Sequence, residues 1–459
     1  MPNPPGGPFA TDLKRAIGFW AGLAIVIGSI VGTGIFRTPA EIVRVLPNPL
    51  VVLALWVVFG LVSLCGALTL AELSSLIPRT GGTYVILQKA YGDSAAFTFG
   101  WMYLVGAIPA SLGAVAMVFA EQLIELSGGQ PATTSPFLVR GIAVGIIVVL
   151  TVINVLGVGL ATTVQSLFTA VKMAALAALF FLALAAGGSD WSRLSAGGEV
   201  VAGGLAQAAA FIIFSYNGWA YLGLVAGEVK DPERQISRII LSGMFIVIVF
   251  YLATNLMYHL TLPISEMAKE TVVARRVAFD LFGPAGGAAM NAAILASVFG
   301  TLCAIVLTNS RVPYAMARDG LGFAILGRCH PKFATPHVAL LVQGAITVAL
   351  ILWLGTFGRL STYFVLVEWT ALVFAIAAIF VLRRKMPDAP RPYRTPGYPF
   401  VPLVFVSVVS VFLLGIAWSN VARGDWAPVL GLAVSLAGFP AFVLWRGLVR
   451  GRARSRSLT

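Results

Sequence analysis

Gly28-Ser29-Ile30-Val31-Gly32-Thr33-Gly34-Ile35-Phe36 interrupts the first long apolar segment of the chain with glycine and small polar residues. Phe214-Ser215-Tyr216-Asn217-Gly218-Trp219 interrupts another apolar segment at the matching place in the second half. Such interruptions let a helix unwind and free backbone N–H and C=O groups. In a membrane these groups cannot face lipid, so they must line a cavity. Paired broken helices therefore predict the binding site of a carrier of small solutes.

The composition indicates a protein that crosses a membrane many times. Of the 459 residues, 59% are hydrophobic and only 11% are charged, whereas a soluble domain is about a quarter charged. The mean hydropathy is +0.92. The three cysteines and three histidines show no metal-ligand spacing. We therefore expect no metal, no cofactor and no enzymatic activity.

Twelve apolar segments are long enough to cross a bilayer, and they divide into blocks of five, five and two. The interrupted segments are the first and the sixth, so each opens a block of five. Because a block with an odd number of spans starts its successor from the opposite side of the membrane, the two blocks are predicted to be inverted repeats. The predicted segments are 16–37, 49–76, 95–125, 137–156, 161–186, 203–228, 237–261, 285–312, 336–356, 361–382, 400–420 and 427–447.

This division predicts a first repeat at 16–186, a second at 203–382 and two further spans at 400–447, with tails at 1–15 and 448–459. About two thirds of the 31 lysines and arginines fall on the side that holds both tails, and such an excess marks the cytoplasmic side. We therefore expect both termini in the cytoplasm and the protein in the cytoplasmic membrane. The same distribution explains the net charge of +13 without nucleic acid, because anionic lipid suits the basic tail.

Four blocks of sequence resemble the amino acid–polyamine–organocation (APC) superfamily, in particular the L-type amino acid transporters and their bacterial relatives. The resemblance covers the first ten segments in order. It implies an all-α polytopic membrane protein of the LeuT type, with twelve transmembrane helices, a five-plus-five inverted repeat and broken helices 1 and 6. The four blocks are Ile27–Phe36, Ala71–Leu73 with Ile77–Tyr84, Phe214–Trp219 with Glu228–Arg234, and Ser310–Gly320.

A zwitterionic amino acid needs acceptors for its ammonium and donors for its carboxylate, and the ends of broken helices offer both. N–H groups near Thr33–Ile35 suit the carboxylate, and free carbonyls before them suit the ammonium. The resemblance implies the same division and makes Phe214 an aromatic gate, whereas close helix packing is the alternative use of the glycines. Whether Asn217 contacts the substrate stays open. The predicted substrate-binding residues are Ile30, Val31, Gly32, Thr33, Gly34, Ile35, Phe214, Ser215 and Asn217.

Lys172 lies in the middle of the fifth apolar segment. A lysine at this depth costs several kcal/mol unless it is paired or neutralised, so it is a functional candidate. The resemblance implies that its ammonium takes the place of a sodium ion and braces the first segment against the fifth. A lysine that reaches the membrane interface is the alternative.

Three acidic residues lie within or at the ends of apolar segments. Glu72 and Glu228 lie near the predicted cytoplasmic ends, where we expect ion pairs of an inner gate with nearby arginines. Glu368 is either a proton site or an interhelical hydrogen-bonding group. Glu228 and Glu368 are therefore candidate proton or gate residues. No acidic residue lies in either interruption, which argues against a strongly cationic substrate.

The sequence thus predicts a sodium-independent secondary transporter of neutral L-amino acids that works by alternating access, either as an exchanger or coupled to protons. A basic amino acid or polyamine antiporter of the same superfamily is the alternative.

In the animal L-type transporters, a cysteine after the third segment forms a disulfide with a heavy subunit. The corresponding loop, Glu121–Phe137, has no cysteine. We therefore expect no disulfide-linked partner, only the amino acid substrate and the lipid bilayer.

Overall fold

The chain folds almost entirely into helices. The structure, a computed structural model, describes residues 15, 17–79, 81–156, 161–186, 189–195, 197–333 and 335–446. Apart from Arg15, the predicted tails 1–15 and 448–459 lie outside these residues. Within the described residues, β pairing is limited to one bridge between Ile17 and Val229. In this bridge Ile17 N–H donates to Glu228 O at 2.9 Å, and Lys230 N–H donates to Ile17 O at 2.8 Å.

Among the described residues, ten helices are long and apolar enough to cross a membrane, and two shorter apolar helices accompany them. The ten are Phe19–Val45, Pro49–Leu76, Asp93–Leu126, Pro136–Val155, Pro232–Thr261, Val273–Cys303, His337–Leu354, Phe357–Lys385, Phe400–Ala422 and Ala427–Arg446. The shorter two, Ala170–Ala185 and Ala202–Ser215, coincide with the fifth and sixth predicted segments. Ala202–Ser215 is too short by itself because the helix stops at the second interruption after 14 residues.

One predicted boundary was wrong. The first segment does not end at residue 37, because its second helix, α2 (Gly34–Val45), continues to Val45. The start predicted for the eighth segment, residue 285, lies next to the kink of α13 (Val273–Asn309), where two helices join at Gly283, whose φ of 68° breaks the helical path.

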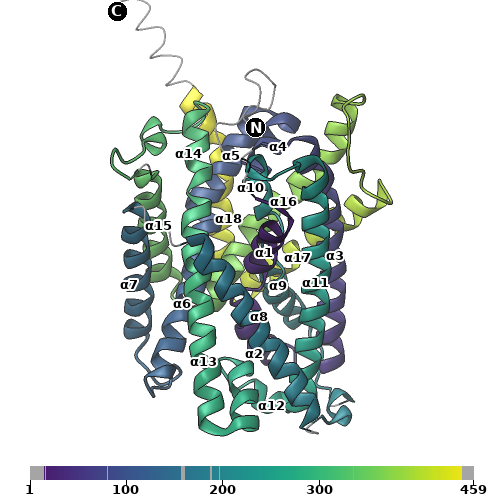
Figure 1. Cartoon of the computed structure of the whole chain (residues 1–459), viewed down its shortest axis with the longest axis vertical. Helices are drawn as coiled ribbons and strands as arrows, with labels where there is room; N and C mark the ends of the chain where they lie inside the picture. The colour runs from purple at the N-terminus through teal and green to yellow at the C-terminus, as the bar shows by residue number, and fades with distance from the viewer. Residues whose placement is uncertain are drawn as a thin grey trace, which may run out of the picture.

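The helices pack side by side along the long axis of the molecule (Figure 1). The short helix α12 (Ile264–Met267) marks one end of the bundle, and α4 (Thr83–Tyr91) and α14 (Arg311–Arg318) mark the other. These are called the α12 end and the α4 end below. The remaining elements are α1 (Phe19–Ile30), α3 (Pro49–Leu76), α5 (Asp93–Met102), η1 (Tyr103–Ala107), α6 (Ile108–Leu126), α7 (Pro136–Val155), α8 (Ala161–Ala185), η2 (Trp191–Ser195), α9 (Ala202–Ser215), α10 (Tyr221–Leu224), η3 (Ala226–Glu228), α11 (Pro232–Thr261), η4 (Ala324–Gly327), α15 (His337–Leu354), α16 (Phe357–Lys385), α17 (Phe400–Ala422) and α18 (Ala427–Leu436).

At the α12 end, ion pairs join several helices. Arg37 Nε lies 2.9 Å from Glu121 Oε2, which links α2 to α6. Arg275 lies 2.7 Å from Glu125 and 3.0 Å from Glu270, which links α13 and the loop before it to α6. Because Glu121 and Glu125 lie about one turn apart, both links end on the same face of α6.

At the α4 end, the ion pairs expected of Glu72 and Glu228 are present. Glu72 is 1% exposed and accepts hydrogen bonds from Arg383 at 2.7 and 3.0 Å and from Thr395 N–H at 2.6 Å. Glu228 accepts a hydrogen bond from Arg311 at 2.9 Å. These contacts link α3 to α16, and the segment after α10 to α14.

Candidate functional site

The first interruption is a complete break between two helices. α1 ends at Ile30, and α2 begins at Gly34. Ile30 O accepts a hydrogen bond from Gly32 N–H at 2.7 Å, within the break. At the start of α2, no side chain caps the helix. Thr33 O accepts hydrogen bonds from the N–H groups of Phe36 and Arg37, the third and fourth residues of α2. In the described chain, the N–H groups of Gly34 and Ile35 therefore have no acceptor, and the positive end of the helix dipole lies with them.

The second interruption is longer. α9 ends at Ser215, and regular helix resumes at Tyr221 in the four-residue helix α10. Asn217 N–H donates to Phe214 O at 3.3 Å. Gly218 has a φ of 121°, which an L side chain rarely adopts, so glycine is required for the backbone path at this point.

The two breaks lie against each other through a reciprocal pair of glycines. A Cβ atom on Gly34 would lie 2.7 Å from Ser215 Cα, at the end of α9. A Cβ atom on Gly218 would lie 2.7 Å from the carbonyl of Ser29, near the end of α1. The Thr38 and Ser215 hydroxyls are also 2.8 Å apart. These two glycines thus serve close packing, and the packing holds the two sets of backbone ends together.

A small cavity of about 30 Å³ lies at the meeting point of the breaks, which is the room of about one water molecule. Six of the nine predicted substrate-binding residues line it, whereas Val31, Ile35 and Ser215 do not. The hydroxyl of Thr33 is buried and has no hydrogen-bond partner among the described residues, so it is free for a ligand. The lining residues are Ser29, Ile30, Gly32, Thr33, Gly34, Ser111, Val115, Phe214, Asn217, Tyr221, Thr301, Ile305 and Phe364.

The sequence analysis missed seven of the thirteen lining residues. Ser111 comes from α6 and Thr301 from α13. Ser111 is the one hydroxyl residue of α6, a signal that the sequence does contain, whereas α13 also contains Ser297 and Thr308, so Thr301 does not stand out. Tyr221 accepts a hydrogen bond from Asn217 Nδ2 at 3.1 Å. The amide of Asn217 is thus held by a neighbour four residues away at the cavity wall.

Lys172 is placed where the sequence analysis expects it. Its side chain is buried, with 3% exposed, and its Nζ donates to Gly28 O at 3.2 Å. Gly28 belongs to the last turn of α1, just before the first break. The contact therefore joins α8 to α1, and burial excludes the alternative in which this lysine reaches the membrane interface.

Glu368 on α16 is buried, with 3% exposed. Among the described residues its Oε2 atom has no hydrogen-bond partner. Phe364, one helical turn before Glu368 on α16, lines the cavity. The structure therefore brings Glu368 near the cavity, whereas Glu228 is held in its ion pair with Arg311 at the α4 end.

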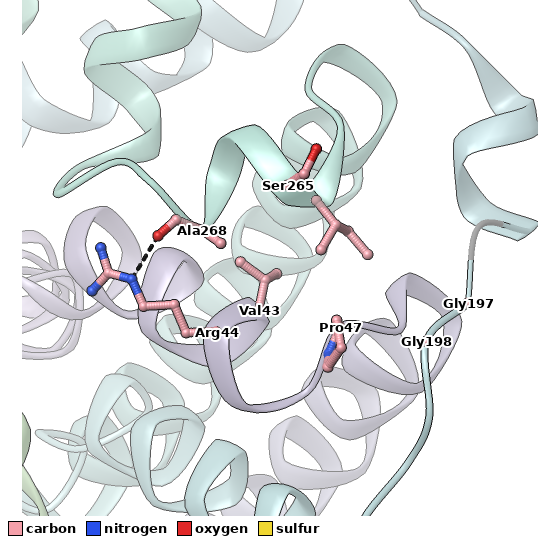
Figure 2. A pocket seen from close by; sticks show the side chains of 8 residues that line it. Val43, Arg44, Pro47, Gly197, Gly198, Ser265 and Ala268 are labelled. Carbon is pink, nitrogen blue, oxygen red and sulfur yellow. Dashed lines mark hydrogen bonds between the residues drawn. The ribbon is translucent and has the colours of Figure 1, made fainter.

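A larger, open pocket of about 640 Å³ lies elsewhere, at the α12 end (Figure 2). It is formed by the end of α2, the loop before α9, and α12. Arg44, its charged residue, already donates to the carbonyls of Ala268 and Glu270, each at 2.7 Å. None of the residues that line this pocket belongs to either break, so it is separate from the cavity at the meeting point of the breaks.

Comparisons with known proteins identify relatives over nearly the whole chain. A family model described as amino acid permease matches residues 17–433. The serine/threonine exchanger SteT of Bacillus subtilis is 32% identical over 436 residues, which cover 94% of this chain and 96% of the exchanger. The human cystine/glutamate transporter is 29% identical over 96% of this chain and 88% of its own length. The human large neutral amino acids transporter small subunit 2 is 29% identical over 96% and 82%.

Proposed function

The chain belongs to the amino acid permease family of the APC superfamily and is a multi-pass membrane transporter of amino acids rather than an enzyme. From this premise we propose that it transports neutral L-amino acids and that this transport does not require sodium. Transport proceeds by alternating access, either as exchange or coupled to protons. The reciprocal packing of the two breaks around the cavity is the observation that carries this proposal.

The carboxylate of the substrate binds at the start of α2. The unaccepted N–H groups of Gly34 and Ile35 and the free hydroxyl of Thr33 support this placement, because a helix start attracts an anion. The ammonium binds carbonyls of the breaks. Ile30 O already accepts a hydrogen bond from Gly32 N–H. This carbonyl oxygen can therefore accept fewer further hydrogen bonds from a substrate ammonium.

A neutral side chain of modest size is supported by the lining of the cavity. The described residues that line it include no acidic or basic residue, and an extra ammonium or guanidinium would need a carboxylate partner. The cavity of about 30 Å³ has room for about one water molecule, so its walls must part when an amino acid enters. Phe214, Tyr221 and Phe364 in the wall are bulky and limit the room for a side chain. The serine/threonine exchanger, named for two small amino acids, is consistent with such a site.

Lys172 replaces a sodium ion at the junction of α8 and α1. The hydrogen bond from its ammonium to Gly28 O supports this role, because a fixed positive charge at a helix end does what a bound cation would do. Glu368 and Lys172 are buried ionisable groups near the breaks that can exchange protons, so they are the sites for proton coupling if transport is driven by protons.

The architecture proposed is the LeuT type, with twelve spans and two inverted blocks of five at 16–186 and 203–382, followed by two spans at 400–447. The breaks in α1–α2 and α9–α10, one at the start of each block, support it. The α4 end faces the cytoplasm, together with both termini. No disulfide-linked subunit is needed, since the connection between α6 and α7 contains no cysteine.

Uptake by purified protein in proteoliposomes tests this function. Labelled alanine, leucine and arginine are offered with and without internal amino acid, a pH gradient and sodium. We expect alanine uptake that ignores sodium and is lost in Lys172→Ala, with Gly141→Ala as a control because nothing lies within 4 Å of a Cβ atom at Gly141. Uptake that depends on internal amino acid indicates exchange, and uptake driven by an inward proton gradient indicates symport. Sodium-driven uptake, or arginine as the sole substrate, would contradict the proposal.

A further inference from the structure

Arg37 on α2 is a buried arginine that lies against an aromatic side chain behind the cavity. It is 7% exposed, and its guanidinium carbon Cζ lies 5.3 Å from the centroid of the Phe357 ring. We propose that Arg37 is a positioning residue that holds Phe357 against Phe214 and so keeps the cavity closed on the side of the α12 end. This inference rests on the proposed function, because only a substrate cavity needs a closure.

Three phenylalanines form a stack that begins at the cavity. Phe214 and Phe364 line the cavity, and their ring centroids lie 5.7 Å apart. Phe357 does not line the cavity, but it meets Phe214 edge to face, with the ring centroids 5.5 Å apart and an angle of 87° between the ring planes. Aromatic pairs favour this arrangement. Phe357 therefore supports Phe214 from behind.

The stack runs from the cavity towards the α12 end. Phe357 is the first residue of α16, and Arg383, near the other end of this helix, contacts Glu72 at the α4 end. Because Phe364 follows Phe357 by about two helical turns, Phe357 lies about 10 Å nearer the α12 end than this cavity residue. Phe357 and Phe214 thus lie between the cavity and the α12 end.

Two carboxylates hold the guanidinium of Arg37 in place. Its Nε lies 2.9 Å from Glu121 Oε2 on α6, and its Nη1 lies 2.6 Å from Glu41 Oε1, one turn later on α2. A guanidinium whose edge is fixed by carboxylates leaves its face for an aromatic ring, and the cation and the ring attract each other. Arg37 therefore fixes the ring of Phe357 relative to both α2 and α6.

Loss of the guanidinium has two consequences, and both favour opening of the stack. Phe357 loses its attraction to a fixed cation. Glu41 and Glu121 become unpaired charges in a mostly buried place, which favours any movement that lets water reach them. Removal of the Phe357 ring deletes the same contact from its other side. If Arg37 acts through Phe357, the two removals share one effect and do not add.

The rate at which a cysteine in the cavity reacts with a membrane-impermeant thiosulfonate tests this inference, because it measures opening without requiring transport. Ser111→Cys places the thiol at the cavity wall, in a chain whose three native cysteines are replaced by alanine. Right-side-out vesicles expose the α12 end under the proposed orientation, and inverted vesicles expose the α4 end. From the α12 end, we expect Arg37→Gln and Phe357→Leu each to raise the rate about fivefold or more. The double variant should exceed the larger single effect by no more than about twofold.

Arg276→Gln is the matched control for the removal of a charge at the α12 end. The acidic partners of Arg276 are Glu266, Glu270 and Asp280, which all lie in its own segment of the chain. These ion pairs therefore link no distant helix. The rate for this variant should stay within about twofold of that for the unsubstituted arginine.

Three outcomes would overturn the inference. The first is an unchanged rate in Arg37→Gln. The second is a rise that Arg276→Gln shows equally, or that occurs only from the α4 end. The third is additivity of Arg37→Gln and Phe357→Leu, because the two side chains would then act separately.

Arg37→Lys takes the place of Arg37→Gln if the latter does not accumulate in the membrane. It keeps a positive charge beside both glutamates but gives up the planar guanidinium. We expect a rise of at least about twofold in the same measurement, and an unchanged rate would overturn the inference. Uptake of alanine by the unsubstituted protein is measured in parallel. If no neutral amino acid is taken up, the proposed function fails instead, so the two failures are distinguishable.

Discussion

The two breaks lie in contact, yet they are built in opposite ways. The first is three residues long, at 31–33, and consists of Val31, Gly32 and Thr33. The second is five residues long, at 216–220, and contains Tyr216 and Trp219, both fully buried. The backbone of the first break is open to the cavity. The second break instead packs the large side chains of Tyr216 and Trp219 into the protein interior around it.

Under the proposed function, this difference assigns different parts of the substrate to the two breaks. The first break offers backbone N–H groups and a hydroxyl, which every α-amino acid can use because all share the same charged groups. The second break, together with Phe214 in the last turn of α9 at the cavity wall, is proposed to determine the size and shape of the side chain that fits. Gly34 and Gly218 are the points at which each break depends on the other, so substitutions there test the comparison most severely.

Gly218→Ala should have the largest effect. The new Cβ atom would lie 2.7 Å from the backbone carbonyl of Ser29, and φ at this position is 121°. Overpacking and backbone strain each cost about 1–3 kcal/mol. We expect uptake of alanine to fall about 100-fold or more at equal protein in the membrane.

Gly141→Ala serves as the control for this variant, because α7 leaves open space at that position. Uptake by Gly218→Ala within about tenfold of the unsubstituted protein would show that the second break can move away from α1, and the two breaks would then not depend on each other.

Gly34→Ala should have the next largest effect. Its Cβ atom would clash with Ser215, at 2.7 Å from both Cα and Oγ, but the residue lies in α-helix and adds no backbone strain. Overpacking alone costs about 1–3 kcal/mol, so we expect uptake to fall about tenfold to 100-fold.

The double variant Gly34→Ala with Ser215→Gly removes the Cβ and Oγ atoms that the new methyl group would meet, and should recover part of the uptake. No recovery would place the defect in the contact with Ser215 Cα, which glycine keeps at 2.7 Å, or in the N–H groups proposed to bind the carboxylate.

Thr38→Val should have a moderate effect. It removes the hydroxyl that lies 2.8 Å from Ser215 Oγ while it keeps the shape of the side chain. One buried hydrogen bond contributes about 0.5–1.5 kcal/mol, so we expect a loss of about twofold to tenfold in alanine uptake. Thr38→Ser, which keeps the hydroxyl, should lose less. A loss in Thr38→Ser without a loss in Thr38→Val would show that the methyl group, and not the link between the breaks, matters at this position.

Gly32→Ala should have the smallest effect, although Gly32 lies in the first break, two residues before Gly34. A Cβ atom here would meet Thr301 Cγ2 at 3.6 Å, an ordinary contact. We expect uptake of alanine and of leucine to stay within about twofold of the unsubstituted protein, because the first break contacts the groups that both amino acids share. Competition between unlabelled leucine and labelled alanine measures this. A much larger loss for leucine than for alanine would contradict the division of recognition between the breaks.

Much of the site could be predicted from sequence because its signals are local. Glycines within apolar runs mark both breaks, and a lysine flanked by apolar residues marks the contact of Lys172 with α1. Of the twelve predicted spans, ten correspond to long helices among the described residues, and the other two correspond to the shorter apolar helices Ala170–Ala185 and Ala202–Ser215. Ala202–Ser215 is short because its helix stops at the second interruption.

The pairing between segments could not be predicted, because it depends on how distant helices pack. Nothing near Gly34 in the sequence indicates that its partner is Ser215, and nothing near Gly218 indicates Ser29. Tyr251 is a tyrosine in an apolar helix, and its sequence neighbours do not show that its hydroxyl reaches two carbonyls from different segments.

The bridge between Ile17 and Val229 has a consequence for mutational tolerance. Its two hydrogen bonds join backbone groups, at 2.9 and 2.8 Å, so exchange of one side chain for another cannot delete either of them. Proline is the exception, because it has no N–H group to donate. In a saturation library, positions 17 and 230 should therefore accept most hydrophobic or polar residues and reject proline. The start of α1 would stay joined to the segment that follows α10 across a wide range of sequences.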